Sequence, residues 1–217
     1  MMTGDEGAAE RAGGGQTRRN VLLMGFSLLV GPRPPGAAAT EDRPMEQNEP
    51  GVDEPNPKAP RELSRFAFLI GRWRFDARFQ SAGGDWQAFR GTWLGRYILD
   101  GYAIADEYRM IGPSGDVIVL GMNFRVYDSA KQVWNIKWFN ALEGTWTDLT
   151  PEQLGGARFD GQSVSYTFKA ERGAQWPFTR ATYTNICESH FTWRGERSED
   201  AKTWTEFMVV ECDRSTE

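Results

Sequence analysis

From residue 66 onward, apolar and aromatic residues alternate with polar ones in short runs, which is the pattern of β-strands. Turns rich in glycine and aspartate separate the runs, and pairs such as Asp100-Gly101 suit tight hairpins because they tolerate positive φ. Only the stretch 62–68 has the pattern of a helical turn. The runs cover residues 66–80, 85–99, 102–111, 117–128, 132–141, 144–150, 157–169, 178–187, 190–198 and 203–213.

Hairpins in series, with no stretch suited to a crossover helix, predict an all-β fold. We expect one antiparallel up-and-down β-barrel of about 9–10 strands, because closing the sheet on itself removes its exposed edges. The alternation also predicts which faces point inward. These faces carry Leu69, Gly71, Trp73, Phe75 and Phe79 in the first run, Ile118, Leu120, Met122, Phe124 and Val126 in the fourth, and Trp134, Ile136 and Trp138 in the fifth. Asn123 and Arg125 are expected on the opposite face of the fourth run.

The first 39 residues resemble a twin-arginine export signal. Arg18 and Arg19 precede an apolar run over residues 21–30, and Arg33 and a small-residue stretch over 36–39 follow it. The apolar run is about half the length of a membrane span, so we expect no stable membrane anchor after cleavage and a periplasmic or secreted location. The alternative is an unprocessed N-terminus from a misassigned start codon.

Residues 40–60 are expected to form a linker without fixed structure. Five prolines stand there among acidic and amide residues, with almost nothing apolar to bury. The domain proper is then residues 61–217, which hold all nine tryptophans of the chain.

Composition excludes several classes of function. The net charge is −5 and the domain has no basic stripe, so nucleic acid is not expected as a partner. Two cysteines and one histidine are too few for a Cys/His zinc cluster, and no metal site is expected. No phosphate-binding glycine loop is present either.

Several motifs resemble lipocalins and their calycin relatives. Gly71-Arg72-Trp73 matches the Gly-x-Trp signature of the first lipocalin strand, and the segments 100–106, 124–128, 191–196 and 202–204 look like a bacterial family of calycin-like domains of unknown function. The resemblance covers about residues 62–213. It implies a barrel with an internal cavity and a basic residue, here Arg214, packed across Trp73, but it implies no reaction.

Aromatic and polar residues on the inward faces are the candidate site. We expect the ligand to contact Trp93, Asp106, Tyr108, Trp138, Asn140 and Trp193. The competing interpretation is that the tryptophans only pack the core.

Three residues are candidates for proton chemistry. Asp106 and Glu206 are in phase with apolar neighbours, where desolvation would raise the pKa of a carboxyl and make it a proton carrier. Alternatively, each is paired with an arginine, and the candidates are Arg109, Arg125, Arg180 and Arg194. His190 is the remaining candidate. It would also be the ligand if the barrel held haem as in the nitrobindins, but its surroundings do not match that family, and we expect no cofactor.

The leading hypothesis is an exported protein that binds a small hydrophobic or aromatic molecule inside a Trp-rich barrel. The alternative is a cofactor-free isomerase, cyclase or lyase that uses carboxylates in the same cavity. A structural module with a filled barrel is a third interpretation. The sequence leaves open whether any reaction is catalysed, the oligomeric state, and whether Cys187 and Cys212 form a disulfide.

N-terminal sequencing of the exported protein tests the assignment of the signal peptide. We expect a mature chain that begins near Thr40, after the small-residue stretch. Recovery of the chain in the cytoplasm with Met1 in place would instead support the unprocessed N-terminus.

Overall fold

The computed structural model describes residues 54–81, 84–170 and 176–215. The expected signal peptide and residues 40–53 of the expected linker lie outside the described residues. Within them, no helix is both long enough and apolar enough to cross a membrane. The elements are η1 (Arg61–Leu69), β1 (Gly71–Gln80), β2 (Trp86–Ile98), β3 (Ala103–Ile111), β4 (Val117–Asp128), β5 (Val133–Asn140), β6 (Thr145–Asp148), η2 (Glu152–Leu154), β7 (Ala157–Asp160), β8 (Ser163–Lys169), β9 (Phe178–Thr184), β10 (His190–Ser198) and β11 (Thr205–Arg214).

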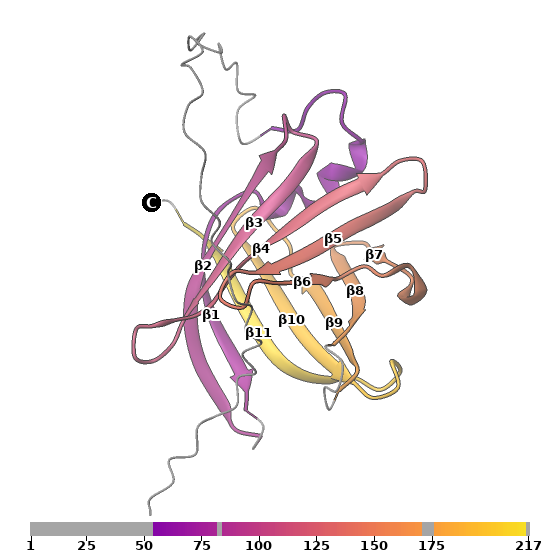
Figure 1. Cartoon of the computed structure of the whole chain (residues 1–217). Coiled ribbons are helices and arrows are strands. Elements are labelled where there is room, and N and C mark those ends of the chain that lie inside the picture. The colour runs from indigo at the N-terminus through magenta and orange to yellow at the C-terminus, as the bar shows by residue number, and fades with distance from the viewer. Residues whose placement is uncertain (1–53, 82–83, 171–175, 216–217) are drawn as a thin grey trace, which may run out of the picture. The chain divides into compact units, whose positions relative to one another are not determined.

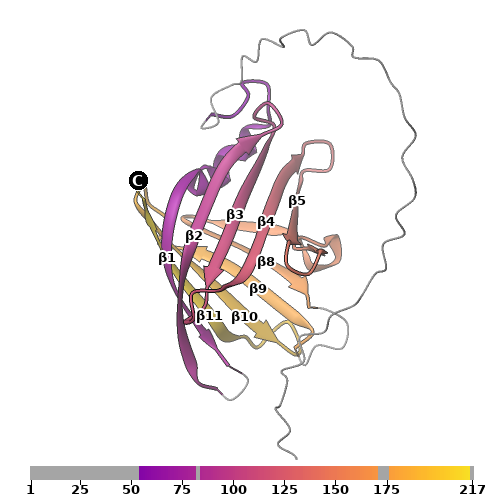
Figure 2. The ribbon, with the colours of Figure 1, turned by 60° about the vertical axis from the view of Figure 1, so that its left-hand side comes forward.

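All eleven strands form one strongly curled antiparallel sheet (Figures 1 and 2). Their order is β6-β5-β4-β3-β2-β1-β11-β10-β9-β8-β7, so β1 to β6 and β7 to β11 each pair in sequence order, and the first strand pairs with the last. Among the described residues no ladder joins β6 to β7, although these strands are consecutive in the chain. The all-β antiparallel prediction is confirmed. The strand number is higher than expected because the run 157–169 turns at Gly161 and becomes two strands.

The helix η1 closes one end of the curled sheet. Its buried residues Leu63, Phe66 and Leu69 are spaced at i, i+3 and i+6, which places them on one face of a 3-10 helix. They face the ends of β2, β3 and β4, and the Phe66 ring meets the edge of Trp134 with centroids 4.7 Å apart. The chain before η1 also contacts the turn between β2 and β3, since the Asn56 amide donates to the Gly101 carbonyl (3.1 Å).

Trp73 fixes the junction between η1 and the sheet. Its indole N–H donates to the Leu69 carbonyl (3.0 Å), and the Arg214 guanidinium lies over its ring at 4.1 Å from the centroid. Arg214 also donates to the carbonyls of Ile70 (2.9 Å) and Glu188 (2.6 Å). The expected packing of Arg214 on Trp73 is therefore confirmed.

The inward face of β4 differs from the prediction. The apolar face was expected inside, but Asn123 and Arg125 are the buried residues, with 6% and 0% exposure, while Ile118 and Val126 are each 41% exposed. The ladder sets Asn123 opposite Asp106, and Arg125 forms an ion pair with that carboxylate. The polar face of β4 can be buried because Asp106, on the neighbouring strand β3, is buried with it and pairs with both Asn123 and Arg125.

The outward apolar residues of β4 are partly covered by the next hairpin. Trp146 on β6 packs against Phe124 and Phe139, with centroids 5.6 and 4.8 Å apart. Trp146 itself is 60% exposed. This outer cluster explains how a hydrophobic run can face away from the barrel interior.

The replacement Arg214→Ala tests the role of the junction. We expect a loss of about 2 kcal/mol in the free energy of unfolding, because a cation–π contact and two charge-assisted hydrogen bonds are removed. Urea denaturation measures it, and the exposed neighbour Arg72→Ala is the control, with an expected change within about 0.5 kcal/mol. Equal losses in the two variants would contradict this role of Arg214.

Candidate ligand-binding cavity

A cavity of about 440 Å³ lies inside the curled sheet, toward the end opposite η1. Phe79, Met110 and Phe168 line it near the last residues of β1, β3 and β8, whereas η1 precedes the first residue of β1. Most of the lining is aromatic or aliphatic. The described lining residues are Phe79, Trp93, Tyr108, Met110, Val119, Asn123, Trp138, Thr147, Leu149, Tyr166, Phe168, Lys169, Ala170, Thr179, Ala181, Tyr183, Trp193, Phe207 and Met208.

Four of the predicted contact residues come together on this lining. Trp93, Tyr108, Trp138 and Trp193 all face the cavity. The Tyr108 ring meets the edges of both Trp93 and Trp138, at 5.3 and 6.4 Å between centroids. These rings come from β2, β3, β5 and β10, so the curvature of the sheet is what brings them together.

Glycines on the inner face let aromatic rings lie close against the backbone. A Cβ on Gly121 would lie 2.4 Å from the Trp138 ring, and one on Gly195 would lie 2.8 Å from the Trp193 ring. Both tryptophans therefore lie along the wall instead of projecting across the space. The cavity owes part of its volume to these two positions.

Below the cavity lies a buried polar cluster, which we call the floor cluster: Trp93, Asp106, Asn123, Arg125 and Tyr183. One oxygen of the Asp106 carboxylate accepts from the Trp93 indole N–H and from the Asn123 amide, both at 2.8 Å. The other oxygen pairs with the Arg125 guanidinium, and both charged side chains have 0% exposure. Asp106 is thus surrounded by donors and does not itself line the cavity.

The guanidinium of Arg125 extends the cluster toward the opposite wall. It donates to the Tyr183 hydroxyl (3.0 Å), which is 3.2 Å from the Tyr166 hydroxyl. Burial raises the pKa of Tyr183 well above its ordinary value, and the nearby guanidinium lowers it only in part. Both tyrosines line the cavity, so the network ends at its surface as two hydroxyl groups.

Glu206 and Asn140, the other two polar residues predicted to face inward, do not line the cavity. Glu206 pairs with Arg194 at 2.6 Å, after the register of β10 and β11 shifts at Gly195 and Glu196. That bulge breaks the alternation on which the inward prediction for Glu206 depended. The Asn140 side chain accepts from the Leu142 amide (3.1 Å) and holds the β5–β6 turn.

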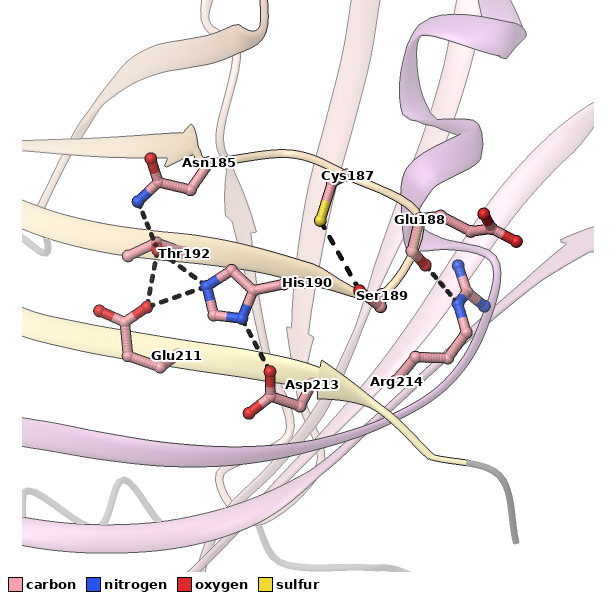
Figure 3. Close-up of polar contacts among 9 residues, drawn as sticks. All are labelled: Asn185, Cys187, Glu188, Ser189, His190, Thr192, Glu211, Asp213 and Arg214. Carbon is pink, nitrogen blue, oxygen red and sulfur yellow. Dashed lines mark hydrogen bonds and ion pairs between the residues drawn. The ribbon is translucent and has the colours of Figure 1, made fainter.

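His190 lies away from the cavity, beside the last residues of β11 (Figure 3). Its Nδ1 is 2.8 Å from Asp213, and its Nε2 is 3.4 Å from Glu211. Two carboxylates on opposite sides of the ring hold the imidazole in place (Figure 3). Nothing described brings His190 near Asp106 or Glu206, so the three candidates for proton chemistry do not converge.

Both cysteines are free thiols. Cys212 is buried opposite Phe191, and its burial raises the pKa of the thiol. Cys187 is exposed in the turn before β10, where hydrogen bonding from the Ser189 backbone lowers the pKa of its thiol. No cluster of three His, Cys, Asp or Glu side chains among the described residues is arranged to hold a metal ion.

Several residues of the site were missed by the sequence analysis. Asn123 was placed on the wrong face, and Tyr166, Phe168, Tyr183 and Phe207 were not singled out. The period-two pattern of Val164, Tyr166 and Phe168 could have indicated the wall that β8 contributes.

Comparison with known proteins bears on the fold alone. No protein-family model matches the chain, and no curated protein matches it. A solved structure, the crystal structure of Rv2717c from M. tuberculosis, matches with a TM-score of 0.52 at 7% sequence identity, over 72% of this chain and 99% of that chain. The fold is therefore calycin-like, as the sequence motifs predicted.

A double-mutant cycle on Asp106 and Arg125 tests the floor cluster. We expect Asp106→Leu and Arg125→Met each to cost about 3–5 kcal/mol, because each leaves its partner as an unpaired buried charge. The double variant should cost clearly less than the sum of the two, since the remaining charge is also removed. Urea denaturation of the four proteins gives the coupling energy.

The exposed pair Arg194 and Glu206 provides the matched control for this cycle. Its side chains are 37% and 34% exposed, so we expect a coupling energy of about 0–1 kcal/mol. The same small value for the buried pair would show that Asp106 and Arg125 do not depend on each other.

Proposed function

We propose that the protein is exported from the cytoplasm and binds a small apolar or aromatic molecule in the cavity. The observation that carries the proposal is the cavity itself: its volume of about 440 Å³ lies in the range of ligand sites, about 300–1,000 Å³, and its walls are mainly aromatic and aliphatic. The described side chains do not fill this space, which argues against a purely structural barrel.

A few polar groups at the base of the cavity would orient the ligand. The Asn123 side-chain amide donates an N–H to the Asp106 carboxylate. Its side-chain carbonyl oxygen accepts no hydrogen bond from the described residues. Among the described residues, the Tyr108 hydroxyl donates one long hydrogen bond, 3.5 Å, to the Met110 sulfur. A ligand with one hydrogen-bond donor at its inner end would therefore find an acceptor at the floor.

The arrangement favours binding over proton chemistry. The Asp106 carboxylate is covered by Arg125, Trp93 and Asn123, has 0% exposure and does not line the cavity. Glu206 and His190 are paired outside it. A general acid or base must come within hydrogen-bond reach of its substrate, and none of the three candidates does so here.

Filling the cavity tests the proposal. The replacement Val119→Trp adds an indole on the inner face of β4, and we expect it to weaken binding of the uncharged dye N-phenyl-1-naphthylamine at least about tenfold. Dye fluorescence and quenching of the cavity tryptophans give the dissociation constants.

The neighbouring position supplies the control for that experiment. Leu120 stands on the outer face of the same strand, so Leu120→Trp adds the same indole without entering the cavity. We expect its dye affinity to equal that of the unmodified protein. Absence of dye binding to the unmodified protein, or equal losses in both variants, would refute a ligand site in the cavity.

A further inference from the structure

Two cationic residues lie near the open end of the cavity. Lys169, the last residue of β8, is the single charged residue in the described lining. Arg197 on β10 shares a cross-strand row with the lining residues Phe168 and Thr179, because Phe168 pairs with Thr179 and Thr179 pairs with Arg197. Arg197 is not itself among the described lining residues, but it and Lys169 both belong to the wall formed by β8, β9 and β10.

Arg197 is held in place but incompletely paired. Its Nη2 donates to the Gln80 side chain at 3.1 Å, and its guanidinium lies over the Trp176 ring at 5.1 Å from the centroid. Its Nε is buried and has no hydrogen-bond partner among the described residues. A buried donor without an acceptor is costly, so a site that supplies an acceptor there would relieve it.

The carboxylates closest in sequence to Arg197 do not pair with it among the described residues. Glu196 accepts two hydrogen bonds from Arg180, both at 2.7 Å. Asp200 accepts from the Lys202 and Thr203 amides of its own turn, which lowers the pKa of its carboxyl to about 2. Glu199 is exposed on the same turn and makes no described ion pair. Among the described residues, no ion pair neutralises the charge of Arg197.

We propose that the cavity selects amphiphilic anions: ligands with an apolar or aromatic body in the cavity and one anionic group, a carboxylate or sulfonate, at the open end beside Lys169 and Arg197. This inference rests on the proposed function, since it requires the apolar body to occupy the cavity. The apolar walls supply affinity for the body, and the two cations supply the preference for the charge. The floor cluster adds no competing charge because Asp106 and Arg125 neutralise each other.

Two dyes of the same ring system test the charge preference. Anilinonaphthalene sulfonate carries one sulfonate, and N-phenyl-1-naphthylamine lacks it. We expect Lys169→Gln and Arg197→Gln each to weaken binding of the sulfonate dye about 3- to 10-fold. The affinity for the uncharged dye should change less than about twofold. Added salt should weaken binding of the sulfonate dye but not of the uncharged dye, because salt screens charges at an open site.

Three further variants complete the experiment. Lys131→Gln removes the same charge from the β4–β5 turn at the η1 end and should leave both affinities unchanged. Arg197→Lys keeps the charge and should retain most of the affinity for the sulfonate dye. Val119→Trp should weaken both dyes, which shows that they bind in the cavity and not on the outer cluster around Trp146.

The outcomes separate the two proposals. If the Lys169 and Arg197 variants lose affinity for the sulfonate dye but not for the uncharged dye, the cavity is anion-selective. Binding of both dyes in the cavity with no effect of these variants overturns the charge preference and leaves the binding function in place. Failure of both dyes to bind in the cavity overturns both proposals.

Discussion

The ion pair between Asp106 and Arg125 constrains the interior of the barrel more than any other contact. Each charge would be very costly to bury alone, so β3 and β4 must pair in the register that brings them together. A slip of one residue would place Arg125 outside and leave the Asp106 carboxylate unpaired in the core. The pair therefore selects the register, and through the register it determines which side chains of β4 reach the cavity.

The cavity follows from an uneven distribution of large side chains along the barrel. Phe66, Trp134 and Phe191 crowd the end that η1 closes, and the floor cluster occupies the middle. Beyond it, glycines on the inner face hold the tryptophan rings against the wall. Open space remains because large side chains fill one end of the barrel and lie along the walls at the other.

The sequence predicted the strands, the antiparallel order and four aromatic residues of the wall, because these depend on local alternation and turn chemistry. The prediction from sequence failed where a residue distant in the chain determines which face of a strand points inward. The apolar face of β4 is outside because Asp106 on β3 requires Arg125 inside, and the Trp146 hairpin covers part of the outer face. Glu206 was misplaced because a bulge at Gly195 shifts the alternation, and a bulge has no reliable signal in a single sequence.

The gap between β6 and β7 has a mechanical consequence. The short segment that follows β6 is bound to β5, where Thr150 accepts from the Ile136 amide (2.9 Å) and donates to the Trp134 carbonyl (2.8 Å). On the other side of the gap, β8 is the one strand of the described chain that pairs with β7. The barrel could therefore widen between β6 and β7. Only side-chain contacts would separate there, and no backbone hydrogen bonds between strands would break. If the cavity binds ligands as proposed, such compliance would let one set of walls accommodate molecules of different girth.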